Sequence, residues 1–131
     1  MQKTAPVVRL TALVIYACLS AAPAVALDDA LGTSLRRLDP ENRLHQLCDI
    51  EMMRRIEAEH GPLHPDRLVM DAESPAVLRR DVLAGTGGAV RSGGQWYRLS
   101  FRCRASAERL QVLELSYKIG SAIPQARWGK G

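Results

Sequence analysis

The stretch RSGGQWYRLSFRC, residues 91–103, decides the fold of this chain. Gly93-Gly94 stands between two runs that suit β-strands, which is the pattern of a tight hairpin with a two-residue turn. Such a turn sets the register of the two strands. It places Ser92 opposite Gln95, Arg91 opposite Trp96, and Val90 opposite Tyr97.

The two faces of this hairpin differ in chemistry, because successive side chains of a strand point to opposite sides of a sheet. One face carries Val90, Tyr97, Leu99, Phe101 and Cys103. The other carries Arg91, Trp96, Arg98, Ser100 and Arg102. We expect the first set in the core and the second in solvent. A register shift of one residue would exchange the two sets, so this sorting specifies the register.

A long helix is predicted upstream of the hairpin. Asp39 suits the N-cap and Pro40 suits the first helical position, where no backbone N–H is needed. Gly61-Pro62 supplies a stop, so the helix should run to about His60. Its inward row is apolar and consists of Leu44, Leu47, Cys48, Met52 and Ile56. The pair Glu51–Arg55 interrupts this face, one helical turn apart.

The remaining segments complete an α+β fold. A short strand is expected at 67–72, residues 73–88 are ambiguous, and Thr86-Gly87-Gly88 is predicted as a flexible connector. Another strand should cover 110–119 and end at Gly120. Its inward side chains would be Leu113, Leu115, Tyr117 and Ile119. A final turn should fold Trp128 back onto the domain. The prediction is one long N-terminal helix packed on a three- to four-stranded antiparallel sheet.

The first 26 residues have the composition of a secretory signal peptide. Lys3 and Arg9 precede an apolar run over 10–22, and Ala24-Val25-Ala26 is an A-x-A cleavage site. We expect cleavage after Ala26 and a periplasmic or secreted protein. Two alternatives remain open. The uncharged run of 10–27 borders on the length of a membrane anchor, and Cys18 lies in a sequence that loosely resembles a lipobox.

Cleavage changes both the charge and the cysteine count. Loss of Lys3 and Arg9 reduces the net charge from +4 to +2, too little to favour nucleic acid as a partner. Residues 27–37 then form a flexible lead-in, and 38–131 form a single domain. Loss of Cys18 leaves two cysteines, and an even number in a small exported domain favours a disulfide over a metal or catalytic site.

The predicted disulfide joins Cys48 on the helix to Cys103 on the sheet. It closes a loop of about 55 residues, which contributes roughly 4 kcal/mol in the chain-entropy model. That contribution is comparable with the whole stability of a small domain. The fold is therefore expected to depend on this bond.

Three blocks of sequence resemble domain-of-unknown-function family 930, a family of alphaproteobacterial envelope proteins. The first begins at Leu38-Asp39-Pro40 and includes Cys48-Asp49. The second is the hairpin stretch of 91–103, and the third is Tyr117-Lys118-Ile119-Gly120 with Trp128. The resemblance implies a Gram-negative, periplasmic setting. It brings no activity, substrate, cofactor or catalytic residue.

The outer face of the hairpin is the predicted ligand-binding surface. Its residues are Arg91, Trp96, Arg98, Arg102 and, on the next strand, Lys118. Guanidinium groups bind phosphate or carboxylate, and an exposed indole stacks on a sugar or sits at a lipid headgroup. An anionic glycan, lipopolysaccharide or a lipid headgroup would fit. The alternative is an ordinary solvated face, with a cation–π pair between Arg91 and Trp96 and with Glu114 neutralising Arg98 or Arg102.

Other chemistry is weakly indicated. His45 and Asp49 have the spacing of a metal-binding pair, but such pairs are usually surface hydrogen bonds. His60, His64 and Asp66 lie in a Pro-rich loop and suggest at most a small hydrolase. No cofactor motif is present, and no catalytic residue is assigned. The sequence favours a non-catalytic binding or interaction module. The alternative is an interaction or structural domain whose exposed sheet edge pairs with itself or with a partner chain.

Overall fold

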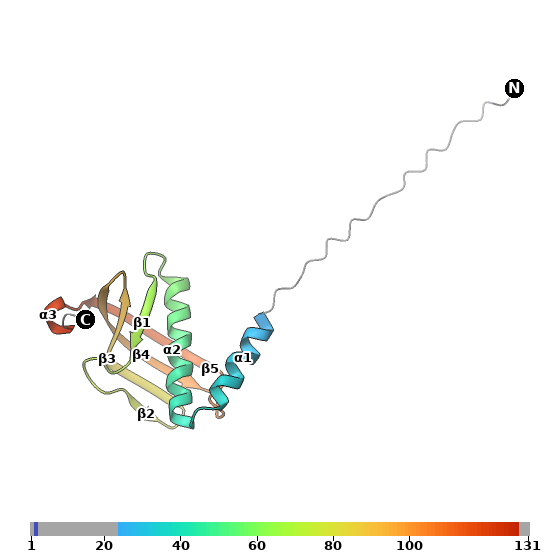
Figure 1. Ribbon diagram of the computed structural model, residues 1–131, viewed down its shortest axis with the longest axis horizontal. Helices are drawn as coiled ribbons and strands as arrows, with labels where there is room; N and C mark the ends of the chain where they lie inside the picture. Colours follow the sequence, from blue (N-terminus) through green and yellow to red (C-terminus); the bar gives the residue numbers. More distant parts are fainter. Residues whose placement is uncertain (1, 3–23, 129–131) are drawn as a thin grey trace.

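In a computed structural model that describes residues 2 and 24–128, one long helix lies across a sheet of five antiparallel strands (Figure 1). The elements are α1 (Ala24–Arg36), α2 (Pro40–Glu59), β1 (Pro65–Val69), β2 (Val77–Arg79), β3 (Val82–Ser92), β4 (Gln95–Ala105), β5 (Val112–Ala122) and α3 (Gln125–Trp128). The α+β class is confirmed. The sheet has one more strand than the upper prediction, and a further helix precedes the long one.

The strands are ordered β1-β3-β4-β5, and β2 pairs with β3 as well. The β3–β4 hairpin has the predicted register, with Ser92 opposite Gln95 and Arg91 opposite Trp96. Gly93 and Gly94 have φ values of +57° and +76°, a conformation that glycine adopts without steric cost. This two-residue turn is the reason that the register could be read from the sequence.

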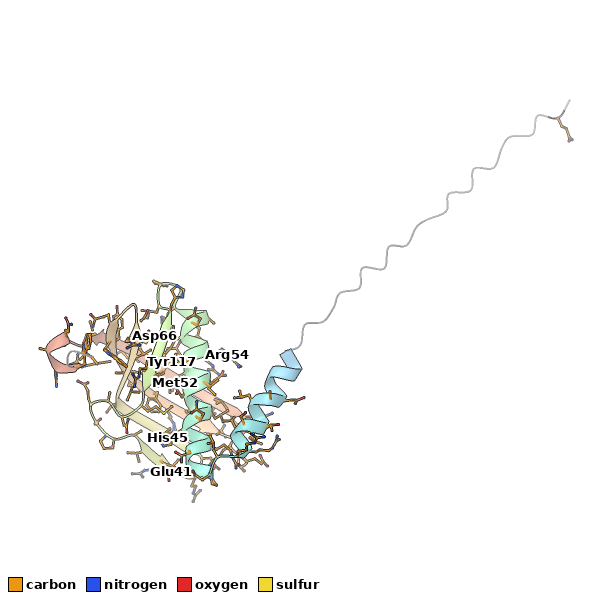
Figure 2. All side chains as sticks on the ribbon, in the orientation of Figure 1. Glu41, His45, Met52, Arg54, Asp66 and Tyr117 are labelled. Carbon is orange, nitrogen blue, oxygen red and sulfur yellow. A yellow bond between two sulfur atoms is a disulfide. The ribbon has the colours of Figure 1, made fainter. Side chains whose placement is uncertain are left out.

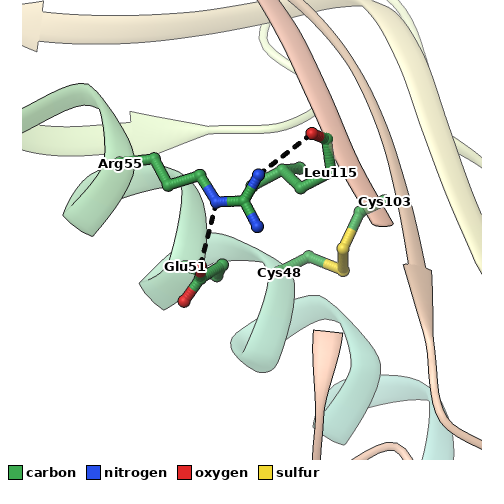
Figure 3. Close-up of a disulfide and its surroundings, with 5 residues drawn as sticks. All are labelled: Cys48, Glu51, Arg55, Cys103 and Leu115. Atoms are coloured by element: carbon green, nitrogen blue, oxygen red, sulfur yellow. Dashed lines mark hydrogen bonds and ion pairs between the residues drawn. A yellow bond between two sulfur atoms is a disulfide. The ribbon is translucent and has the colours of Figure 1, made fainter. Parts of the chain in front are cut away.

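The core lies between α2 and the sheet. The predicted helix row is buried throughout, and the β4 positions Leu99, Phe101 and Cys103 are at most 5% exposed. Asp39 caps the helix by accepting a hydrogen bond from the backbone N–H of Asn42 at 3.1 Å. The predicted disulfide between Cys48 and Cys103 is confirmed, and both cysteines are fully buried (Figure 3).

Most of the segment 27–37, expected as a flexible lead-in, lies within helix α1. Leu35 is only 2% exposed, and Leu31, one turn before it, packs against the core. Arg43 of α2 donates hydrogen bonds to the carbonyls of Leu35, Arg36 and Leu38, so carbonyls at the end of α1 are satisfied by a side chain. The helix is thus stabilised by contacts with α2 that local sequence does not reveal. The predicted signal peptide lies almost entirely outside the described residues.

The glycine-rich segment Thr86-Gly87-Gly88 was predicted as a connector, and this prediction is wrong. It lies inside β3, at a register shift between Gly85 and Gly88. The backbone of the 71–76 loop crosses here, because the N–H of Glu73 donates to the carbonyl of Gly87 at 2.7 Å. A Cβ on Gly87 would overlap Ser74. Glycine is needed for this close approach, not for flexibility.

The ends of the other strands also differ from prediction. β1 starts two residues earlier than expected, and β5 continues through Gly120 to Ala122. Leu113, predicted to point inward, is 50% exposed, because the β4–β5 register shifts between Arg104 and Ala105. The predicted final turn is confirmed: α3 covers Gln125–Trp128, and the indole N–H of Trp128 donates to the carbonyl of Ile123 at 2.9 Å. Within residues 24–128, no helix is both long and apolar enough to cross a membrane.

Candidate anion-binding face

The outer face is the side of the sheet that points away from α2. Residues paired across the strands share a face, so the register aligns the outer side chains in rows. One row contains Val77, Ala84, Arg102 and Ser116, and the next contains Arg79, Val82, Arg104 and Glu114. Ser100 and Lys118 form a third row beside Arg102. The sheet therefore places basic side chains from β2, β4 and β5 on one surface.

Two of the predicted ligand-binding arginines already have acidic partners. Arg91 forms two hydrogen bonds with the carboxylate of Asp66, at 2.9 and 3.1 Å, and these lower the pKa of Asp66. Its guanidinium also lies 5.6 Å from the ring centroid of Trp96, which confirms the expected cation–π pair. Arg98 lies 3.4 Å from the carboxylate of Glu73 and donates to the hydroxyl of Ser121. The guanidinium groups of Arg91 and Arg98 are therefore already engaged in contacts within the protein.

Glu114 neutralises a different arginine from the two that were expected. Its carboxylate lies 3.0 Å from the guanidinium of Arg104, because these residues are directly opposite in the β4–β5 register. The hydrogen bond from Arg104 lowers the pKa of Glu114, and the charge of Arg102 contributes a smaller effect in the same direction. The prediction that Glu114 pairs with Arg98 or Arg102 is therefore wrong.

Arg79, Arg102 and Lys118 make no ion pair and no side-chain hydrogen bond within the described part of the chain. Arg79 and Arg102 flank a hollow of about 470 Å³. The other residues that line it are Pro75, Val77, Val82, Ala84, Gly85, Thr86 and Phe101. Its lining contains two guanidinium groups, no carboxylate and a largely apolar floor. We call this site the outer hollow.

Sequence reasoning identified Arg102 and Lys118 but missed Arg79. The missed residue lies in the stretch of 73–88 that gave no clear periodicity, and β2 spans only three residues. Arg79 reaches the outer face because Leu78 pairs with the buried Leu83, which leaves its two neighbours on the opposite side. The alternation of β2 is visible only once its pairing partner is known.

The histidines do not form a common site. His45 lies near the start of α2, and Asp66 lies on β1 near the other end of that helix (Figure 2). His60 packs edge-on against Tyr117, with the ring centroids 5.7 Å apart, and His64 Nδ1 lies 2.9 Å from Glu57. With Asp66 bound to Arg91, each member of the suggested hydrolase trio contacts a different neighbour.

The pKa values of Asp49 and Tyr117 are raised, but these two side chains do not form a reactive centre. Burial raises the pKa of Asp49. Burial and the hydrogen bond to Glu59 raise the pKa of Tyr117 to about 12, so its phenol is a weaker acid than that of an ordinary tyrosine. Among the described residues, no three or more His, Cys, Asp and Glu side chains are placed to hold a metal ion. The outer hollow is thus the candidate site with the most distinctive chemistry.

The comparisons with known proteins place the chain in a family but not next to a characterised relative. No curated protein and no solved structure matches it. Residues 35–131, which include α2, all five strands and both cysteines of the disulfide, match the family described as Domain of Unknown Function (DUF930). Because this match covers well over half of the sequence, the chain belongs to the DUF930 family.

Proposed function

We propose that this protein is a non-catalytic, exported binding module that holds an anionic envelope component in the outer hollow. The observation that carries the proposal is the pair Arg79 and Arg102, two guanidinium groups that form no ion pair or side-chain hydrogen bond within the described residues and that line the same partly apolar hollow. The composition of the first 26 residues supports export, and the periplasm or cell exterior is the proposed location.

The electrostatics favour this site over the rest of the basic face. Binding an anion at Arg91 or Arg98 would require breaking an existing ion pair with Asp66 or Glu73. Arg102 needs no such exchange, and Lys118 lies diagonally across the β4–β5 pair from it. A surface charge without an ion pair attracts an oppositely charged ligand, and no existing ion pair has to be broken when the ligand binds.

The proposed ligand has a phosphate or carboxylate group joined to an apolar portion. A guanidinium binds either anion through paired hydrogen bonds. Val77, Val82 and Ala84 present apolar surface between the two arginines and would contact hydrocarbon rather than a second charge. Lipid headgroups and lipopolysaccharide phosphates have this combination. An anionic glycan would engage the arginines but leave the apolar floor unused.

The test is retention of the purified chain on vesicles and on immobilised lipopolysaccharide. Vesicles of phosphatidylglycerol supply the anionic arm, and vesicles of phosphatidylcholine supply the neutral arm. We expect retention on the anionic surfaces only, and we expect the double variant Arg79→Glu/Arg102→Glu to lose at least about tenfold in affinity, since each reversed charge removes an attraction and adds a repulsion.

A matched control separates the site from total charge. Arg36 and Arg37, at the end of α1 and in the link to α2, are exposed and make no ion pair or side-chain hydrogen bond within the described residues, and neither lines the outer hollow, so Arg37→Glu/Arg36→Glu changes the net charge equally outside the site. That control should retain binding. Equal loss in both double variants would reduce the effect to net charge, and unchanged binding in Arg79→Glu/Arg102→Glu would dismiss the proposal.

A further inference from the structure

β5 is a long strand at the edge of the sheet. It spans Val112–Ala122 and pairs with β4 on one side only. Such an edge presents unpaired backbone N–H and C=O groups, which can accept another strand. Most of its side chains are exposed, including the apolar Leu113 at 50%.

The register shows which backbone groups face outward. The N–H of Ala105 donates to Asp81 on the β3 side at 2.9 Å, so the odd-numbered residues of β4 turn toward β3 and the even-numbered ones toward β5. The backbone groups of Arg102 and Arg104 therefore point toward β5, where Ser116 and Glu114 lie opposite them. It follows that the backbone groups of Leu115, Tyr117 and Ile119 point away from the sheet.

A side chain of α2 occupies part of this edge. Arg55 donates from its terminal nitrogen to the carbonyl of Leu115 at 3.1 Å and from Nε to Glu51 at 3.0 Å (Figure 3). The first bond uses an outward carbonyl that a partner strand would need. The second holds the guanidinium in place. The two residues interrupt the apolar row of α2, and together they form what we call the edge clamp.

The sequence of β5 is complementary to itself in one antiparallel register. When two copies are related by a two-fold axis through Ser116, Glu114 of each lies opposite Lys118 of the other. Leu115 then lies opposite Tyr117, so outward backbone groups meet outward backbone groups. The exposed Leu113 lies opposite Ile119. A shift of the axis to Tyr117 would place Glu114 opposite Gly120 and lose both charge pairs.

We propose that β5 pairs with β5 of a second copy of this chain, antiparallel and centred on Ser116, and that the edge clamp controls this pairing. Release of Arg55 from Leu115 frees the carbonyl for the second copy. The paired strands would join two sheets into one continuous sheet, held by backbone hydrogen bonds and two Glu114–Lys118 ion pairs, in each of which the carboxylate of Glu114 is shared with Arg104 of its own chain. This inference does not depend on the outer hollow, because no residue of β5 lines that hollow.

Cysteine cross-linking tests the register directly. In a Cys18→Ser background with the Cys48–Cys103 bond intact, Ser116→Cys places two thiols at a non-hydrogen-bonded pair with Cα atoms about 4.5 Å apart, within the range for a disulfide. Lys118→Cys is the matched control, because its two copies would lie about 14 Å apart at roughly 3.4 Å per residue. Mild oxidation should link the first variant and leave the second monomeric. An equimolar mixture of Glu114→Cys and Lys118→Cys should form the mixed dimer.

The clamp is tested by adding Arg55→Ala to the Ser116→Cys chain. We expect the concentration for half-maximal cross-linking to fall by about tenfold, and light scattering of Arg55→Ala alone should show a larger dimer fraction. If Arg55→Ala does not fold, the comparison of Ser116→Cys with Lys118→Cys still decides the register. Linkage at both positions alike, preferential linkage in a mixture of Ser116→Cys and Lys118→Cys, or no linkage at any concentration would overturn the proposal.

Discussion

Breaking the Cys48–Cys103 bond is expected to be the largest single perturbation of this fold. The bond joins residues 55 apart in sequence, and both cysteines are fully buried. Closing a loop of that length reduces the conformational entropy of the unfolded chain and so raises its free energy by roughly 4 kcal/mol. For a domain of about 100 residues, each kcal/mol corresponds to about 4–8 °C, so the melting temperature should fall by roughly 15–30 °C.

Two forms of the protein separate the effect of the bond from the effect of packing. Reduced wild-type protein keeps both sulfur atoms in the core, whereas Cys48→Ala/Cys103→Ala also removes them. We expect both to lose the loop-closure contribution, and we expect the double variant to lose about a further 1 kcal/mol from the small cavities. The measurement is thermal and urea unfolding followed by far-UV circular dichroism, with and without reductant.

A small effect of reduction would contradict the proposed role of the disulfide. If reduced protein melts within about 5 °C of the oxidised protein, the loop-closure argument fails, and the contacts of α2 with β1 and β5 hold the helix without the bond. If the extra loss of stability in the double variant exceeds the loss caused by reduction, the packing of the sulfur atoms contributes more than the constraint on the unfolded chain. The double variant therefore measures what reduction alone cannot.

Gly87→Ala should destabilise the fold by about 1–3 kcal/mol in urea unfolding, because its Cβ would overlap Ser74, whereas Gly61→Ala, with open space around it, should be nearly neutral. Arg43→Ala removes four hydrogen bonds to backbone carbonyls, so it should cost about 1.5–3 kcal/mol, and hydrogen exchange should accelerate in α1 while that of β4 changes little. Arg91 holds the pKa of Asp66 below its ordinary value of 3.8, so this pair should stabilise the fold fully above that pH and lose its effect as the pH falls through the lowered pKa. An acid titration of the melting temperature should show this loss in wild type and not in Asp66→Asn.

The sequence predicted the candidate surface better than the state of its charges. Strand alternation alone placed Arg91, Arg98 and Arg102 on one face, and the structure places them there. Which of them is free depends on Asp66 and Glu73, which come from β1 and the loop that follows it. Partners that lie 25 residues away in sequence cannot be read from a local pattern, so the most available arginine was known only from the fold.

The local sequence of this protein determined its hairpin, its long helix and the disulfide between them. Gly93-Gly94 sets a two-residue turn, Asp39-Pro40 starts α2, and the remaining cysteines have a single pairing once Cys18 is set aside. These features depend on residues close in sequence or on a count, so they need no knowledge of neighbours. The tertiary structure alone decided that α1 packs on α2, that Gly87 lies within a strand, that Arg79 joins Arg102 at the outer hollow, and that Arg55 reaches the β5 edge. Each of these is a contact between distant segments, and its free energy exists only after the chain has brought those segments together.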